Sequence, residues 1–180
     1  MTDHLETEPD AAVAQQRDEV DDLVAAWRRE RPDLDVTPLE VLSRITRLAR
    51  HLDRARGQAF SRHGLEGWEF DVLAALRRAG EPYRLSPGKL LQQTLVTSGT
   101  MTNRIDRLAA RGLVERHPSL DDRRSVMVQL TEAGVTKVDA ALIDLLAHER
   151  AILTDLSADD ADTLASLLRR MLTRFDHPAG

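Results

Sequence analysis

The chain has 180 residues, a length that suits one domain with a substantial core. Cysteine is absent, which excludes disulfide bonds and thiolate metal sites, and the aromatic share of 3% is typical of helical proteins. No apolar run approaches the roughly 18 residues of a membrane span, and residues 1–10 are acidic, so we expect a cytoplasmic protein without a secretory signal.

The net charge is −5, but its distribution is uneven along the chain. Residues 1–36 hold eleven acidic side chains against four basic ones, whereas residues 86–131 hold seven basic side chains against four acidic ones. Phosphate groups respond to the local field, because salt screens charges beyond about 8–10 Å. The basic middle of the chain is therefore a candidate nucleic-acid surface despite the negative total.

Three helices are expected in the first part of the chain. Residues 11–30 place apolar side chains at helical spacing, which predicts an amphipathic helix. A second helix is predicted over residues 37–60, because Thr37, a proline and Glu40 form a pattern typical of a capped helix start. A third is predicted over residues 65–78, closed by a glycine.

Two short consecutive helices follow and predict a helix-turn-helix unit. Ser86 is a cap followed by proline and opens a helix over residues 86–93. Thr97 is the cap of a second helix over residues 97–111, and Gly112 is well placed to end it. Helices joined by three or four residues are the signature of this motif.

The segment after this unit predicts a β-hairpin and two further helices. Residues 113–116 and 125–130 have the pattern of short strands, joined by a charged turn at residues 117–124. Capped helices are then predicted over residues 131–153 and 157–175. The expected fold is mainly α with a small β-hairpin, which is a winged helix-turn-helix domain with a helical region from both termini.

The helix over residues 97–111 has two different faces. Met101, Ile105 and Leu108 are expected to point into the core. The remaining arc carries small polar and basic side chains that can enter a major groove, among which Asn103 suits adenine and Arg107 suits guanine or phosphate. The predicted DNA-binding residues are Ser86, Lys89, Thr97, Ser98, Thr100, Thr102, Asn103, Arg107, Arg123 and Arg124.

Each of these residues also has a simpler interpretation. Serine, threonine and asparagine at a helix start are usually caps or solvated surface. Arg123 and Arg124 could belong to a solvated turn in which Asp121 and Asp122 neutralise them. A hairpin with a basic tip directly after a two-helix unit favours DNA binding over these alternatives.

Three runs of residues resemble the MarR family of regulators. Residues 95–108 resemble its recognition helix, and residues 112–116 together with 121–131 resemble its wing. The resemblance covers residues 37–175 and implies an obligate homodimer that binds double-stranded DNA at a palindromic, inverted-repeat operator. It also implies that Asp122 and Arg124 pair and that Arg123 enters the minor groove. The usual mode of regulation in this family is repression that a ligand relieves.

With this resemblance the chain divides into five segments. We expect a disordered tail at 1–10, an extra N-terminal helix and linker at 11–36, and a dimerisation helix at 37–64. The DNA-binding domain is expected at 65–131 and the C-terminal dimerisation helices at 132–180.

Four residues resemble the signature of the urate-responsive branch of this family. They are Trp27, Asp71, Arg104 and Arg116. The resemblance implies a small anionic ligand such as urate, a purine or a tricarboxylate, and no cofactor. Asp71 lies between apolar neighbours, so we expect it to be partly buried and to need a cation such as Arg116. A packing role for Trp27, a static Asp71–Arg116 pair and a phosphate contact by Arg104 remain the alternatives.

Enzymatic function is not expected. The six histidines are scattered without metal-ligand spacing, and the sequence lacks phosphate-binding loops and a nucleophile elbow. The alternative to a ligand-responsive regulator is a DNA-binding or architectural protein without a small-molecule effector.

Overall fold

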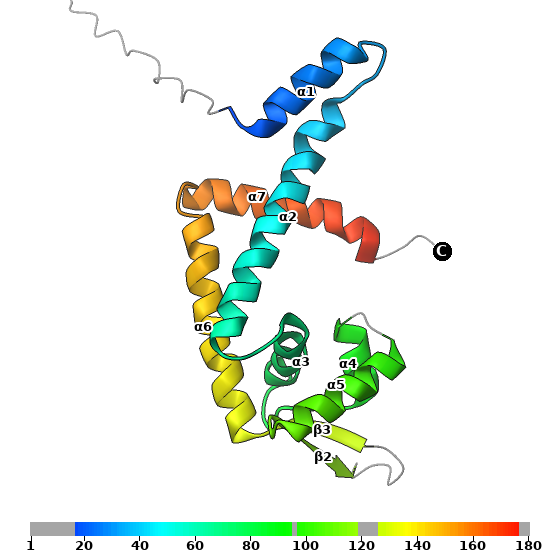
Figure 1. Ribbon diagram of the computed structural model, residues 1–180, viewed down its shortest axis with the longest axis vertical. Coiled ribbons are helices and arrows are strands. Elements are labelled where there is room, and N and C mark those ends of the chain that lie inside the picture. The colour runs from blue at the N-terminus through cyan, green and yellow to red at the C-terminus, as the bar shows by residue number, and fades with distance from the viewer. Residues whose placement is uncertain (1–16, 95–96, 119–125, 177–180) are drawn as a thin grey trace, which may run out of the picture. The chain divides into compact units, whose positions relative to one another are not determined.

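The computed structural model describes residues 17–94, 97–118 and 126–176. The chain forms two compact units, residues 1–51 and 52–180, and helix α2 (Thr37–Arg62) contributes to both. Figure 1 shows the order of the elements along the chain. In the described part of the chain, no helix has the length and apolar character needed to cross a membrane.

The first unit consists of α1 (Glu19–Glu30) and the beginning of α2. Its small core is formed by Val20, Val24 and Val36. Helix α1 begins at Glu19, because the Asp18 carboxylate accepts hydrogen bonds from the backbone N–H groups of Val20 and Asp21 and caps it. The part of the predicted helix over residues 11–16 lies outside the described residues, as does the tail predicted at 1–10.

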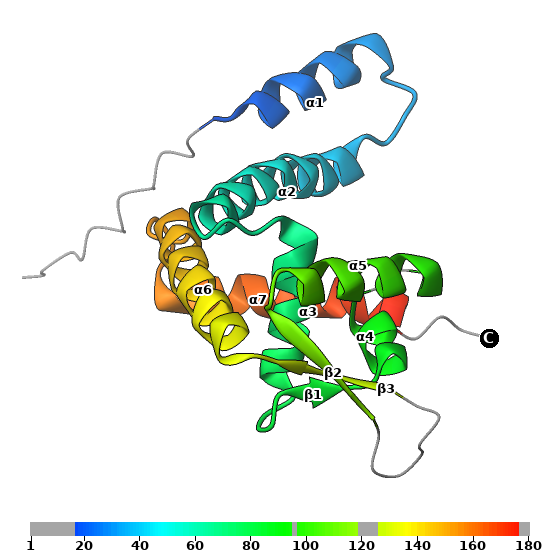
Figure 2. The same cartoon turned by 60° about the horizontal axis from the view of Figure 1, so that its bottom comes forward.

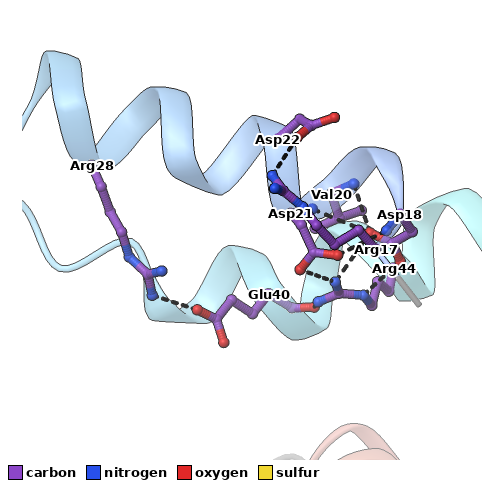
Figure 3. A network of polar contacts seen from close by, with 8 residues as sticks. All are labelled: Arg17, Asp18, Val20, Asp21, Asp22, Arg28, Glu40 and Arg44. Carbon is purple, nitrogen blue, oxygen red and sulfur yellow. Dashed lines mark hydrogen bonds and ion pairs between the residues drawn. The ribbon is translucent and has the colours of Figure 1, made fainter. Parts of the chain in front are cut away.

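A network of ion pairs joins α1 to α2 within this unit (Figure 3). The guanidinium of Arg44 donates to Asp18 at 2.8 Å and to Asp21 at 2.8 Å, and Arg28 donates to Glu40 at 2.5 Å. The hydrogen bond from Arg44 holds the pKa of Asp18 below its ordinary value. The capped start predicted for α2 from Thr37 and Glu40 is wrong, because the Thr37 N–H donates to Asp35 at 3.0 Å and Glu40 pairs with Arg28.

The second unit includes, besides the end of α2, three helices that pack around a small sheet. The helices are α3 (Gly67–Arg78), α4 (Pro87–Thr94) and α5 (Ser98–Ala110). The strands are β1 (Arg84–Leu85), β2 (Val114–Pro118) and β3 (Val126–Leu130), and they form an antiparallel sheet in the order β1-β3-β2 (Figure 2). The predicted hairpin is confirmed, with Val114 opposite Leu130. Strand β1 was not predicted, because two residues are too few to show an alternating pattern.

One core holds these elements together. Phe60 at the end of α2 stacks on Phe70 of α3, with ring centroids 4.1 Å apart. Leu73, Leu90 and Leu108, one from each of α3, α4 and α5, are fully buried in the same cluster. The orientation of α5 is therefore determined by apolar packing against two other helices.

Two more helices complete the second unit, α6 (Glu132–Ile152) and α7 (Ala158–Asp176). Both predicted caps are confirmed, because the hydroxyls of Thr131 and Ser157 accept backbone hydrogen bonds at 3.0 and 3.1 Å. Much of the apolar surface of α7 is exposed in the single chain, as in Leu164, Leu167, Met171, Leu172 and Phe175.

Candidate nucleic-acid interface

Helix α5 has the two faces that the sequence predicts. Met101, Ile105 and Leu108 are each at most 1% exposed. Ser98, Thr100, Thr102 and Asn103 are exposed on the remaining arc. The helix is thus anchored by one face and presents small polar side chains on the other, which is the arrangement that a major groove accepts.

The two ends of α5 differ in how they are closed. Thr97 occupies the cap position, but its hydroxyl lies 2.9 Å from that of Thr100 and makes no bond to the helix backbone. At the other end Gly112 has a φ of 66°, and the next N–H donates to the carbonyl of Leu108 at 3.0 Å. The glycine end predicted from sequence is confirmed.

The first helix of the motif, α4, begins at a conventional cap. The backbone N–H of Lys89 donates to the hydroxyl of Ser86 at 3.3 Å, and the Lys89 side chain is exposed. This capping role accounts for a serine at position 86 without any contact to DNA. The Lys89 ammonium is in solvent, where it can meet a phosphate.

Two arginines of α5 contact α3. Arg107 donates to Glu66 at 2.8 Å, and its guanidinium carbon lies 4.7 Å from the ring centroid of Trp68. The guanidinium carbon of Arg104 lies 5.3 Å from the same centroid. The Trp68 ring N–H donates to Glu66 at 2.7 Å, and this bond, followed by the one from Arg107, holds the pKa of Glu66 below its ordinary value.

A buried carboxylate strengthens the contact between α3 and α5. Glu69 is 1% exposed, accepts from Arg111 at 2.5 Å and accepts from the backbone N–H of Glu66 at 2.9 Å. Arg111 also donates to the carbonyl of Gly64 at 2.7 Å. The sequence analysis missed Glu66, Trp68 and Glu69. The glutamates three residues apart at a helix start were an available signal.

The residues of the predicted ligand site have different surroundings. Trp27 lies on α1 and is 47% exposed. Asp71 is exposed on α3 rather than partly buried, and Arg116 of β2 pairs with Asp106 of α5 at 2.6 Å rather than with Asp71. The expected Asp71–Arg116 pair is therefore wrong, because strand β2 directs Arg116 to α5.

Asp71 nevertheless lines a cavity that reaches the Trp68 side chain. The cavity measures about 350 Å³, and its wall is formed by Asp53, Arg56, Gly57, Phe60, Gly67, Trp68 and Asp71. Since Arg104 packs on Trp68, the cavity and the recognition helix share one aromatic ring.

Two other features concern the wing and metal binding. Arg123 and Arg124, the predicted wing contacts, lie outside the described residues. In the described segments, no group of three or more His, Asp or Glu side chains could hold a metal ion.

Comparison with known proteins identifies the family. Residues 63–125 match the MarR family. The chain is 40% identical over 153 residues to the HTH-type transcriptional regulator PecS of Dickeya dadantii (strain 3937), covering 85% of this chain and 92% of that protein. It is 31% identical over 122 residues to the multiple antibiotic resistance protein MarR of Escherichia coli (strain K12), covering 67% of this chain and 82% of that one.

Solved structures agree with this relationship. A mutant of MarR from E. coli, crystallised in complex with operator DNA, superposes with a TM-score of 0.63 at 28% identity. The match covers 77% of this chain and 99% of that one. These relatives are transcription regulators and not enzymes. The chain belongs to the MarR family of DNA-binding transcription regulators.

Proposed function

We propose that the protein is a homodimeric repressor whose binding to an inverted-repeat operator is relieved by a small anionic ligand. The observation that carries the proposal is the division of α5 into a face that is at most 1% exposed and an exposed face of small polar side chains. A helix fixed in this way can read bases without rearranging its own core.

Asn103 is the residue proposed to read a base. Its side chain is exposed one turn into α5, and an asparagine amide can pair with both N6 and N7 of adenine. Ser98, Thr100 and Thr102 beside it are short enough to let the helix backbone approach phosphate groups. Arg107 contacts α3 in the free protein and would have to leave Glu66 to reach DNA.

A homodimer is supported by the apolar surface of α7. Leu167 is 49% exposed, Leu172 is 58% exposed and Phe175 is 78% exposed, all on one amphipathic helix. An apolar face of this kind is costly in water and is expected to be covered by a second copy of the chain. Such a dimer would place two copies of α5 at half-sites roughly 34–36 Å apart.

The ligand response is proposed to involve Asp71, Arg104 and Arg116. A ligand in the cavity beside Asp71 would touch the ring of Trp68, on which Arg104 rests. The contact of Arg104 with that ring and the ion pair of Arg116 with Asp106 both hold α5. A ligand that draws either arginine to itself would break the corresponding contact. The ligand would then favour a conformation with weaker DNA binding, which is the thermodynamic requirement for relief of repression. A role for Trp27 stays a prediction.

The DNA-reading role is tested by Asn103→Ala on a duplex that the wild-type protein selects from a random library. We expect the variant to bind the selected duplex about 5- to 150-fold more weakly for each half-site, since each protomer of the dimer loses one bidentate base contact, with unrelated duplexes little affected. Gln58→Ala, which removes an exposed amide from α2, is the matched control. Equal weakening on all duplexes would contradict base reading by Asn103.

The ligand response is tested by titrating urate, xanthine and aconitate into the protein–duplex complex. We expect at least one to release the wild type, and Asp71→Ala to retain DNA binding while losing the response. Asp22→Ala, which removes an exposed carboxylate from α1, is the control. Release by none of these anions would favour a DNA-binding protein without an effector.

A further inference from the structure

A second cavity of the DNA-binding unit is lined by cations and has no acidic side chain. It measures about 670 Å³ and lies where the end of α3, strand β1 and helix α4 meet. Its lining, here called the basic notch, consists of Arg78, Ala79, Arg84, Leu85, Lys89, Gln92 and Gln93. Three cations and two amides in one hollow surface favour an oxyanion.

Arg84, one of the residues that line the notch, is held in place by a neutral partner. Arg84 and Gln129 face each other in the register of β1 and β3. The Nε and Nη2 groups of Arg84 donate to the Gln129 amide oxygen at 3.0 and 2.5 Å. A neutral amide orients the guanidinium and leaves its full positive charge for another partner.

The cations of the notch differ from other arginines of the same unit. Arg77, next to Arg78, pairs with Asp139 at 2.9 Å, and Arg107 and Arg116 also have carboxylate partners. Arg78, Arg84 and Lys89 form no ion pair with any residue in the described segments of the chain.

Backbone geometry keeps these cations together. The turn between α3 and β1 is tight, since the N–H of Tyr83 donates to the carbonyl of Gly80 at 2.6 Å and both residues have positive φ. Lys89, Gln92 and Gln93 are spaced three and four positions apart on α4, so they share one face of that helix. The notch is thus formed by the fold and not by flexible side chains alone.

We infer that the basic notch binds a phosphate of the DNA backbone. Helix α4 is the first helix of the helix-turn-helix motif, which crosses the sugar-phosphate backbone when the second helix enters the groove. The contact carries no sequence information and adds to the base reading by α5. The inference rests on DNA binding by this chain, and it assigns a site that none of the recognition-helix residues supplies.

The test compares the wild type with the double variant Arg78→Gln/Lys89→Gln. Both side chains are exposed, so their replacement should have little effect on folding. In a homodimer each protomer loses one phosphate contact, so the magnitude of the slope of log Kobs against log salt concentration should fall by about 1.8, that is about 0.9 per protomer, equally on the selected duplex and on unrelated duplexes. Arg29→Gln, which removes one exposed cation from α1, should leave the slope unchanged. An unchanged slope in the double variant would refute the inference.

A second measurement identifies the phosphate itself. Methylphosphonate groups, which lack the negative charge, are introduced one at a time into the selected duplex. We expect one position to weaken the wild type and to have no effect on the double variant. The absence of such a position would overturn the inference.

A third arm distinguishes DNA from a free anion. Inorganic phosphate and pyrophosphate, titrated into the protein alone, should bind the wild type and the double variant equally weakly. Tight binding that is lost in the double variant would assign the notch to a free anion and overturn the inference. A wild type that binds no duplex at all would refute the DNA-binding function itself, whereas intact binding with an unchanged slope refutes only the notch.

Discussion

The first turn of α6 contains a glycine whose replacement has a calculable consequence. Gly134 is buried, and a Cβ atom added there would lie 2.1 Å from the backbone oxygen of Leu113 and 3.2 Å from a methyl group of Leu130. Ordinary van der Waals contact lies at about 3.5 Å, so Gly134→Ala must push the helix or the strand aside by more than about 1 Å.

The cost follows from what this displacement breaks. The N–H of Thr131 donates to the same Leu113 oxygen at 3.2 Å, and losing that bond costs about 1 kcal/mol. Overpacking adds about 1–3 kcal/mol, whereas the better helix propensity of alanine returns about 1 kcal/mol. We expect Gly134→Ala to lower the free energy of unfolding by about 2 kcal/mol and Tm by about 4–8 °C.

The assay is thermal unfolding followed by circular dichroism, at one fixed chain concentration because a dimer makes Tm concentration-dependent. Gly57→Ala is the matched control, since this helical glycine of α2 has no atom within 4 Å of the added Cβ. The control should match or exceed the wild-type Tm. A Gly134→Ala protein as stable as the control would refute the steric argument.

Two further predictions concern the contact between α3 and α5. Glu69→Gln should lower the free energy of unfolding by about 1–3 kcal/mol, because the Arg111 guanidinium loses a charged acceptor, and an unchanged urea midpoint would contradict this. The lowered pKa of Glu66 contributes stability that is complete above the ordinary glutamate pKa of about 4.3 and is lost as the pH falls through the lower folded-state value. Urea midpoints measured between about pH 5 and 3 should therefore fall less steeply in Glu66→Gln than in the wild type, and parallel curves would show that this pair has no effect.

Local signals in the sequence predicted the helices and their ends. Thr131, Ser157 and Gly112 act on backbone groups within a few residues of themselves, so their roles can be inferred without knowing the fold. The buried positions Ile105 and Leu108 of α5 follow in the same way from the helical period. These local rules were sufficient to outline the winged helix-turn-helix unit.

Partners distant in the sequence were decided only by the tertiary structure. Strand β1 forms because β3 supplies its hydrogen bonds. The sequence of two residues contains no pattern from which this pairing could be predicted. Arg116 was expected to meet Asp71 and pairs with Asp106. A charged side chain has many possible partners in a sequence, and the packing of strands and helices selects one of them.

The basic middle of the chain was thus evident from the sequence, but the groups that its cations contact were not. Arg104, Arg107 and Lys89 all lie in this segment, and the sequence predicted a ligand contact for Arg104 and DNA contacts for Arg107 and Lys89. In the folded chain Arg104 and Arg107 pack on Trp68, whereas Lys89 lines the basic notch together with Arg78 and Arg84. Charge composition is a property of the sequence, whereas the neighbour that each charge meets depends on packing between elements that are far apart along the chain.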